Sequence, residues 1–509
     1  MASVQSMEMM GATNLTDFPW EEAWNWTNDD IDNYTGYYPY SNYGEMGYIE
    51  ALYTFFVWDT WISIKKMASK KLLYPAFLYT LGVACIAIAL NTKERYRAAW
   101  VTASIAIGAA IIQYISKTDF VYVIKDTMVR LVIIHNMGAV VMILWEKFCL
   151  TEEQKRLPWG QRAIATYKIM WNSRFVNTSR PAPVFHLLRA DEERQKAVLR
   201  ATIKNHKMEE LISNTAPVQQ PDYQSGIFPY IKKAWNAAPQ FRRRAWGCVS
   251  RPVARLWNWF SPRTRWIVQT TVIVTTVWVL DRVIDQVAQV IIVFDWDDVE
   301  LHKISFFRRL HEVTSREIVI RCFFAFQAIW GAYAFYTMIH SAIAIFFVAL
   351  RIDEPEEWPP VFGDIRQAWN LRRFWSKYWD RLIYRAVNGL GEMFMTAIGL
   401  GRRPFRGKKR WLLNGLVFAI SGIFHGLTDY FSGIHCSYLW ELWWWNMNFV
   451  GIVGETVLLH TIQTYFPRFY YKMSGKAGKA IGFLWVFAWL FWASPKNQFT
   501  AMHCLPQNR

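Results

Sequence analysis

Three polar residues are spaced to share one face of an apolar helix, where they could carry acid–base chemistry. Ser421, His425 and Asp429 lie four residues apart within the apolar run 411–431, so their side chains stack about one turn apart. An ionisable side chain inside a membrane helix is costly enough to indicate function. The pattern favours a catalytic histidine, with a structural hydrogen bond as the alternative. A Ser-His-Asp nucleophile triad does not fit, because this stacking leaves no room for a substrate carbonyl between nucleophile and base.

An aromatic stretch ends in a second candidate group, the carboxylate of Asp380. Within residues 374–382 the apolar side chains recur at i, i+1, i+4, i+5 and i+8, which predicts an amphipathic helix lying at the membrane interface. A carboxylate beside such a tryptophan-rich surface is either paired with a neighbour, here Arg373 or Arg381, or has a shifted pKa suited to chemistry. Both alternatives remain open from the residues alone.

The composition points to a membrane protein that positions these groups. Of 509 residues, 53% are apolar and only 19% charged, and the apolar ones gather in runs close to the ~20 residues that a helix needs to cross a bilayer. These runs exclude an ordinary soluble enzyme, and their continuity excludes a membrane β-barrel. The sequence predicts an all-α polytopic membrane helical bundle of about eight transmembrane helices, between six and ten. The clear candidates are 72–90, 98–115, 318–350, 411–431 and 438–460, and the weaker ones are 48–64, 131–145, 266–294 and 477–492.

Charge divides the chain into four regions. Residues 1–70 begin with an acidic segment that lacks Lys and Arg over its first 50 positions; we expect it to be lumenal and to contain a candidate first span. Residues 71–145 hold the N-terminal transmembrane helices. Residues 146–265 are rich in Lys and Arg, which predicts a basic cytoplasmic loop with interfacial helices. Residues 266–500 hold the remaining spans and both candidate groups.

The expected surroundings follow from three further patterns. The net charge of +17, without any nucleic-acid-binding signature, indicates membrane lipid and not nucleic acid as the anionic partner. Glycosylation sequons in the acidic segment suit its exposure to the lumen of the secretory pathway. We expect an integral membrane protein of the endoplasmic reticulum. Six scattered cysteines suggest neither a disulfide framework nor a zinc site, and no histidine pair has metal-ligand spacing, so no metal is expected. The candidate glycosylation sites are Asn14, Asn25 and Asn33.

Two motifs carry a family resemblance. The pattern W-P-P-x-F-G…L-R-x-F-W-x-x-x-W at 358–379 is followed by F-x-x-S-G-x-x-H at 418–425. Together they resemble the wax synthase branch of the membrane-bound O-acyltransferase superfamily, and in particular fungal acyl- and acetyltransferases of secondary metabolism. The resemblance identifies 266–500 as a wax synthase-like acyltransferase domain.

The resemblance implies O-acylation in a tunnel within the bundle. Acyl-CoA would be the co-substrate, a hydrophobic alcohol the acceptor, and no cofactor would stay bound. His425 holds the position of the catalytic histidine, which would deprotonate the acceptor hydroxyl. Asp380 holds the second catalytic position, where wax synthase-like relatives usually carry His and sterol and diacylglycerol acyltransferases carry Asn. Its charge would disfavour a developing thioester oxyanion. The substrate-binding candidates are Trp375, Trp379, Ser421 and Asp429.

A basic cluster precedes the His425 span and could hold the phosphates of coenzyme A. The same cluster is what the positive-inside rule places at any cytoplasmic helix end, so both roles stay open. The candidates are Arg402, Arg403, Arg406 and Lys409.

The expected reaction is acetyl or short acyl transfer to a terpenoid-type secondary metabolite, with long-chain wax or sterol ester synthesis as the alternative. Two other classes remain: a transporter with His425 and Asp380 as proton relays, although no internal repeat is visible, or an inactive acyltransferase-like scaffold. The acyl length, the acceptor and the oligomeric state stay open.

Overall fold

The structure is a computed structural model that describes residues 70–120, 122–172, 260–292, 296–401, 403–473 and 475–504. Three sequence predictions lie outside the described residues: the candidate span 48–64, the three glycosylation sites and Arg402. Of the basic loop 146–265, only its two ends are described.

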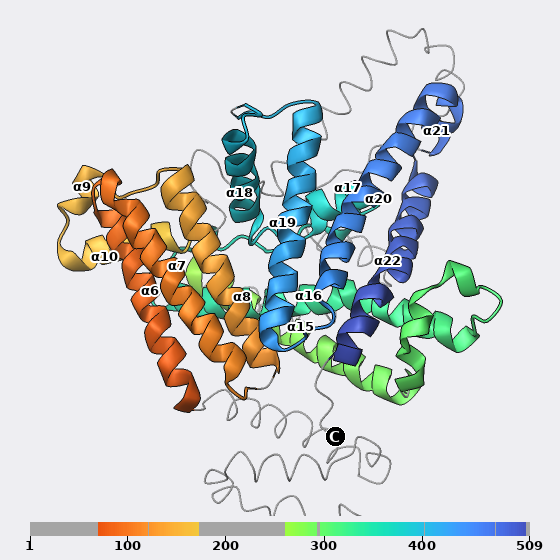
Figure 1. Ribbon diagram of the computed structural model, residues 1–509, viewed down its shortest axis with the longest axis horizontal. Coiled ribbons are helices and arrows are strands. Elements are labelled where there is room, and N and C mark those ends of the chain that lie inside the picture. Colours follow the sequence, from red (N-terminus) through yellow and green to blue (C-terminus); the bar gives the residue numbers. More distant parts are fainter. Residues whose placement is uncertain are drawn as a thin grey trace, which may run out of the picture.

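The described residues fold into helices without any β-strand, which confirms the all-α prediction. The N-terminal helices pack as a group (orange in Figure 1), and α18 lies between that group and the C-terminal helices (blue). The longer helices are α6 (Leu73–Asn91), α7 (Glu94–Lys117), α8 (Tyr122–Ala139), α10 (Trp159–Met170), α15 (Pro262–Ile292), α16 (Ser315–Ala349), α18 (Tyr384–Ala397), α19 (Lys408–Ser432), α20 (Tyr438–Tyr465) and α22 (Lys476–Cys504). The short ones are η4 (Lys70–Leu72), η5 (Val140–Trp145), α9 (Glu152–Lys155), η7 (Trp296–Val299), η8 (Leu301–Ile304), η9 (Phe307–Arg309), η10 (Pro355–Glu357), η11 (Ile365–Gln367), α17 (Leu371–Arg373), η12 (Phe374–Tyr378) and α21 (Pro467–Met473).

Seven of the described helices are long and apolar enough to cross a membrane, so the chain is polytopic. The weaker candidates 131–145 and 477–492 fall in such helices, and so does most of 266–294; the helix that contains 131–145 extends back to Ile124. The predicted span 438–460 is the exception. It forms helix α20, but α20 is not among these seven helices. Its buried Asn448 and Glu455 lower its mean hydropathy, and they are tolerated because α20 packs between α19 and α22.

The aromatic stretch is not an interfacial helix, so that prediction was wrong. Residues Phe374–Tyr378 form one π-helical turn directly after α17. The wide turn directs aromatic rings inward, and Phe374 and Tyr378 are almost fully buried in the largest part of the core. Burial inside the protein satisfies these large apolar side chains better than a half-exposed position at the interface would.

A buried carboxylate on α20 anchors the loop that leads into this turn. Glu455 accepts the backbone N–H groups of Leu371 (2.8 Å) and Arg372 (3.4 Å), both at the start of α17, and the indole N–H of Trp485 (2.9 Å). The first N–H groups of a helix have no partner within the helix, so the carboxylate caps them. On α22, a Cβ at Gly482 would lie 2.0 Å from the carbonyl oxygen of Trp369, so only glycine permits this close approach.

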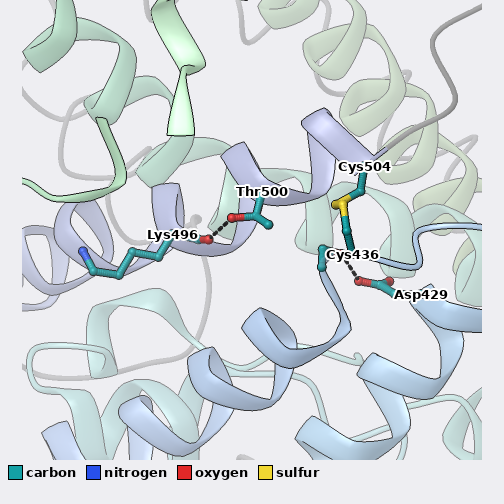
Figure 2. The surroundings of a disulfide bond; sticks show 6 residues. Asp429, Cys436, Lys496, Thr500 and Cys504 are labelled. Carbon is teal, nitrogen blue, oxygen red and sulfur yellow. Dashed lines mark hydrogen bonds between the residues drawn. A yellow bond between two sulfur atoms is a disulfide. The ribbon is translucent and has the colours of Figure 1, made fainter. Parts of the chain in front are cut away.

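One disulfide corrects the cysteine prediction. Cys436, in the turn between α19 and α20, is bonded to Cys504 at the end of α22, with Cα atoms 5.6 Å apart (Figure 2). The two residues are 68 positions apart, and only the packing of α20 against α22 brings them together. No local spacing pattern in the sequence marks such a pair.

Polar contacts between helix ends show which of them lie on the same side of the bundle as the disulfide and which lie on the opposite side. Near the disulfide, the Lys496 ammonium donates to the carbonyl of Ile304 (3.1 Å), and His503 contacts the carbonyl of Val299 (3.1 Å), so the connection between α15 and α16 lies at this end. At the other end, Arg263 donates to the carbonyl of Val348 (2.7 Å).

Two further contacts connect helix ends on the side opposite the disulfide. Lys168 on α10 pairs with Glu357 (2.8 Å), and Arg403 pairs with Glu146 (2.5 Å). The described ends of the basic loop and the basic start of α19 therefore lie together, away from the disulfide.

Candidate active site

A cavity within the bundle brings the two predicted catalytic residues together. Both His425 and Asp380 line it, although they come from α19 and from the turn after η12. Most of the wall is apolar, and five helices contribute to it. The lining residues are Arg130, Ile133, Ile134 and Met137 from α8, Tyr336 from α16, Trp379, Asp380, Leu382 and Ile383 from the turn, Val387 from α18, Ser421, Phe424, His425 and Thr428 from α19, and Trp445 from α20.

The imidazole of His425 is held between an aromatic ring and a guanidinium. Its ring stacks on Trp445, with centroids 4.7 Å apart and planes 29° apart. Nη1 of Arg130 lies 2.8 Å from Nδ1 of His425. Arg130 is held in turn by Asp126, whose two carboxylate oxygens lie 2.9 and 2.8 Å from its Nε. The contact with Trp445 limits ring rotation, so the ring presents a fixed edge to the cavity.

The sequence interpretation missed Arg130 and Asp126. The predicted span began at position 131, just after them, whereas the helix begins at Tyr122. An Asp and an Arg four residues apart face the same side of a helix and can pair. This spacing, beside an apolar run, was the feature of the sequence that could have revealed the pair of Asp126 and Arg130.

Asp380 is positioned by the turn that follows the π-helix. Its Oδ1 accepts the backbone N–H of Leu382 at 3.1 Å, a local turn that fixes the carboxylate. The backbone of Arg381 donates to the carbonyl of Val361 (3.2 Å), which ties the turn to the W-P-P segment. Of the two predicted partners, Arg373 donates to the carbonyl of Gln367 (3.0 Å).

The other predicted partner, Arg381, is 5% exposed. Its Nε and Nη2 atoms have no hydrogen-bond partner among the described residues. Its guanidinium lies over the Tyr384 ring, 5.3 Å from the centroid, and burial lowers its pKa. A buried arginine with unused donors is expensive unless a ligand satisfies it.

The four substrate-binding candidates divide into two pairs. Ser421 and Trp379 line the cavity. Trp375 lies behind that wall, with its ring 4.9 Å from Trp379 and 5.3 Å from Trp445. Asp429 is buried away from the lining and accepts a hydrogen bond from the Ser437 hydroxyl (3.3 Å) beside the disulfide (Figure 2). The structure therefore does not bring Trp375 or Asp429 to the cavity wall.

The basic cluster is also divided. Arg403 already pairs with two carboxylates, Glu146 at 2.5 Å and Glu392 at 3.3 Å. Arg406 and Lys409 are exposed at the start of α19. Arg403 is therefore less suited to phosphate binding than the sequence suggested.

Another arginine links this exposed end of α19 to the buried turn. Arg410 donates to the hydroxyl of Tyr384 at 3.4 Å, and the ring of Tyr384 lies under Arg381. Basic groups therefore extend from the start of α19 to Arg381, the residue next to Asp380.

The fold and the cavity together describe a polytopic helical bundle that encloses both candidate residues. Residues 358–447 match the model of the Membrane bound O-acyl transferase family, and this segment contains both Asp380 and His425. The resemblance found in the two motifs is thereby confirmed, and with the seven apolar helices it marks an integral membrane protein.

Several fungal acetyltransferases are similar to this chain. Acetyltransferase aurG of Calcarisporium arbuscula is 28% identical over 209 residues, which cover 40% of this chain and 48% of the relative. Acetyltransferase ataH of Aspergillus terreus is 30% identical over 175 residues, covering 33% and 55%. Acetyltransferase fsoF of Humicola fuscoatra is 26% identical over 191 residues, covering 36% and 44%. The chain thus matches about half the length of these relatives. No solved structure matches it.

Proposed function

We propose that this protein transfers an acyl group from an acyl-CoA thioester to the hydroxyl of a hydrophobic alcohol. The observation that carries the proposal is the cavity that joins His425 and Asp380, the two positions that the motifs select. Holding two substrates in one cavity turns a bimolecular step into an effectively unimolecular one, worth up to ~7–11 kcal/mol of the barrier.

An acetyl or short acyl donor and a terpenoid-type acceptor fit the proposal best. The similar fungal proteins are named acetyltransferases. The acceptor side is supported by the wall of the cavity, where Ile133, Ile134, Met137 and Phe424 offer apolar contacts and few polar groups. Such a wall favours a compact hydrocarbon skeleton carrying one hydroxyl group.

The phosphates of the donor would bind on the basic path from the start of α19. Arg406 and Lys409 are exposed there, while Arg410, Tyr384 and Arg381 continue inward toward Asp380. A phosphate would satisfy the unused donors of Arg381 by charge-assisted hydrogen bonds. On this path the phosphates would lie between the exposed start of α19 and Arg381, and the thioester would lie at the cavity.

We place the protein in the endoplasmic reticulum membrane, with the disulfide end lumenal. Disulfides persist in oxidising compartments such as that lumen. The opposite ends carry Lys168, Arg263, Arg403 and Lys409, as expected for a cytoplasmic face. Acyl-CoA arriving from the cytoplasm would then meet the basic path first.

Coenzyme A release tests the function directly. Purified protein in lipid nanodiscs should release free thiol from acetyl-CoA when farnesol is added, and the ester should appear by mass spectrometry. Hexadecanol with palmitoyl-CoA tests the long-chain alternative. His425→Ala should abolish release, whereas His460→Ala, at an exposed position on α20, should not. Wild-type protein that releases no more thiol than His425→Ala with a panel of alcohols would refute acyl transfer.

A further inference from the structure

Arg130 brings a permanent positive charge to the cavity. Among the described residues that line it, Arg130 is the one arginine or lysine, and it comes from α8, outside both sequence motifs. In acyl transfer the carbonyl oxygen of the thioester turns negative, and a fixed N–H donor or cation beside it lowers the barrier. The carboxylate of Asp380 lines the same cavity, and its charge opposes such an oxyanion. A cation in the wall compensates for that charge.

Asp126 holds Arg130 in one orientation. Both carboxylate oxygens of Asp126 lie close to Nε of Arg130, at 2.9 and 2.8 Å. The two residues are four positions apart on α8 and share one face of the helix. Their side chains are only 23% and 16% exposed, so the ion pair is partly shielded from water. The guanidinium is therefore ordered before any substrate binds, and its Nη1 reaches the imidazole of His425.

The contact with His425 shows which nitrogen of the ring can act as a base. A guanidinium can only donate hydrogen bonds, so the Nδ1 atom that lies 2.8 Å from Nη1 carries a lone pair and not a proton. A lone pair is what a general base uses to take the proton of the acceptor hydroxyl. Arg130 and the basic nitrogen of His425 therefore meet at one point of the cavity wall, where a hydroxyl and a thioester could react.

We propose that Arg130 is a catalytic residue that stabilises the thioester oxyanion while His425 acts as the general base, an inference that rests on the proposed acyl transfer. The acceptor hydroxyl takes the place of Nη1 at His425 and gives its proton to Nδ1 as its oxygen bonds to the thioester carbonyl carbon. The carbonyl oxygen becomes negative and accepts an N–H of Arg130. The C–S bond then breaks, the carbonyl forms again, and the thiolate leaves as coenzyme A with the proton from His425.

The arrangement keeps the charges balanced at each stage. Without substrates, Arg130 is paired with Asp126 and the imidazole beside it is neutral. A protonated His425 facing Arg130 alone would be disfavoured by like-charge repulsion. In the proposed step the imidazolium and the oxyanion form together, and the oxyanion lies between the two cations. A preorganised donor aimed at an oxyanion contributes about 10²–10³ in kcat, and a charged donor is stronger than a neutral one.

A charge-balanced substitution tests the role of Arg130. Arg130→Met alone would leave the Asp126 carboxylate without its cation inside the bundle, which is strongly destabilising, so it is combined with Asp126→Asn. We expect this double variant to lose at least about 10²-fold in kcat, with the KM for acetyl-CoA changed by less than about threefold. Arg130→Lys keeps the charge and should retain a kcat at least about tenfold above that of the double variant.

The matched control is a second buried ion pair with the same spacing. Arg321 and Glu317 on α16 pair at 2.9 Å and are 0% and 3% exposed, and neither is among the residues that line the cavity. Arg321→Met with Glu317→Gln should lower the Tm without a comparable loss of kcat. Thermal unfolding in nanodiscs shows which variants are folded. A folded Arg130→Met, Asp126→Asn variant with kcat within about threefold of wild type would overturn the proposal.

Analogue binding provides a second measurement that needs no turnover. Trifluoroacetonyl-CoA carries a ketone that cannot be cleaved, and its electron-poor carbonyl adds an alcohol or water to form a stable tetrahedral anion, whereas acetonyl-CoA stays a plain ketone. By isothermal titration with farnesol present, wild type should bind trifluoroacetonyl-CoA at least about tenfold more tightly than acetonyl-CoA. The double variant should lose this preference and keep its affinity for acetonyl-CoA.

A substitution that merely disturbed the fold would weaken both analogues equally, and that result would make Arg130 a structural residue. Arg130→Gln with Asp126→Asn, whose amides can bond to each other in place of the ion pair, carries the same comparison if the first double variant does not fold. Active wild type with an equally active double variant would remove the role of Arg130 and leave acyl transfer standing. Wild type that releases no thiol with any alcohol would refute the proposed function itself, so the two failures are distinguishable.

Discussion

Glu455 on α20 accepts the backbone N–H of Leu371 over 2.8 Å, and this contact ties the motif-bearing loop to the helix whose Trp445 stacks on His425. Glu455→Ala would leave buried N–H groups without a partner, at a cost of about 1–3 kcal/mol each. We expect a lower Tm and a lower kcat together. Glu455→Gln, which keeps an acceptor oxygen, should lose less of both. The exposed Glu356→Ala is the control and should change neither. An unchanged Tm in Glu455→Ala would show that the cap is dispensable.

Asp429 should matter less than its place beside His425 suggests. It lies off the cavity wall and bonds to Ser437. Asp429→Asn should lower kcat by less than about tenfold, while His425→Ala lowers it by at least about 10²-fold. Steady-state kinetics on both variants give the comparison. A loss in Asp429→Asn as large as that of His425→Ala would place Asp429 in the catalytic machinery.

Arg381 should affect the binding of acetyl-CoA and not the binding of the acceptor alcohol. Arg381→Met removes the N–H groups that are proposed to bind phosphate, and one charge-assisted hydrogen bond is worth about 1.5–3 kcal/mol. We expect the KM for acetyl-CoA to rise by about tenfold or more, with the KM for the alcohol little changed. Arg366→Met, on the exposed arginine that pairs with Asp364, is the matched control. A larger effect on the alcohol KM would refute the donor path.

The Cys436–Cys504 bond should stabilise the bundle. It closes a segment of 68 residues, for which the chain-entropy model gives about 4 kcal/mol. Cys436→Ser, Cys504→Ser and the double variant should lower Tm by similar amounts, because each removes the same bond. Thermal unfolding in nanodiscs measures this. If the double variant is much less stable than either single variant, the cysteines contribute through packing and not through the bond.

Engineered sequons test the orientation. Lys303→Asn creates the sequon N-I-S on the disulfide side, and Cys149→Asn creates N-L-T on the opposite side. In microsomes we expect the first to gain a glycan, seen as a mass shift that a glycosidase reverses, and the second to gain none. The reverse pattern would invert the proposed topology.

The sequence by itself determined most of the membrane-spanning helices, and its motifs selected the two candidate positions of the site. A bilayer demands about 20 apolar residues per span with all backbone groups satisfied internally, so runs such as 72–90 and 98–115 could be read as helices directly. His425 and Asp380 could be selected because each is an ionisable residue in an apolar or aromatic setting, and because His425 ends one recognisable motif while Asp380 directly follows the other.

Only the tertiary structure decided what these groups contact. The contact between Arg130 and His425 joins positions 295 residues apart, and the disulfide and the Glu455 cap likewise depend on which helices pack together. Asp429 has the same spacing as Ser421 from His425, yet only Ser421 reaches the cavity. Helical periodicity assigns a face to a side chain, but the neighbouring helix determines whether that face meets a substrate, a partner or the protein core.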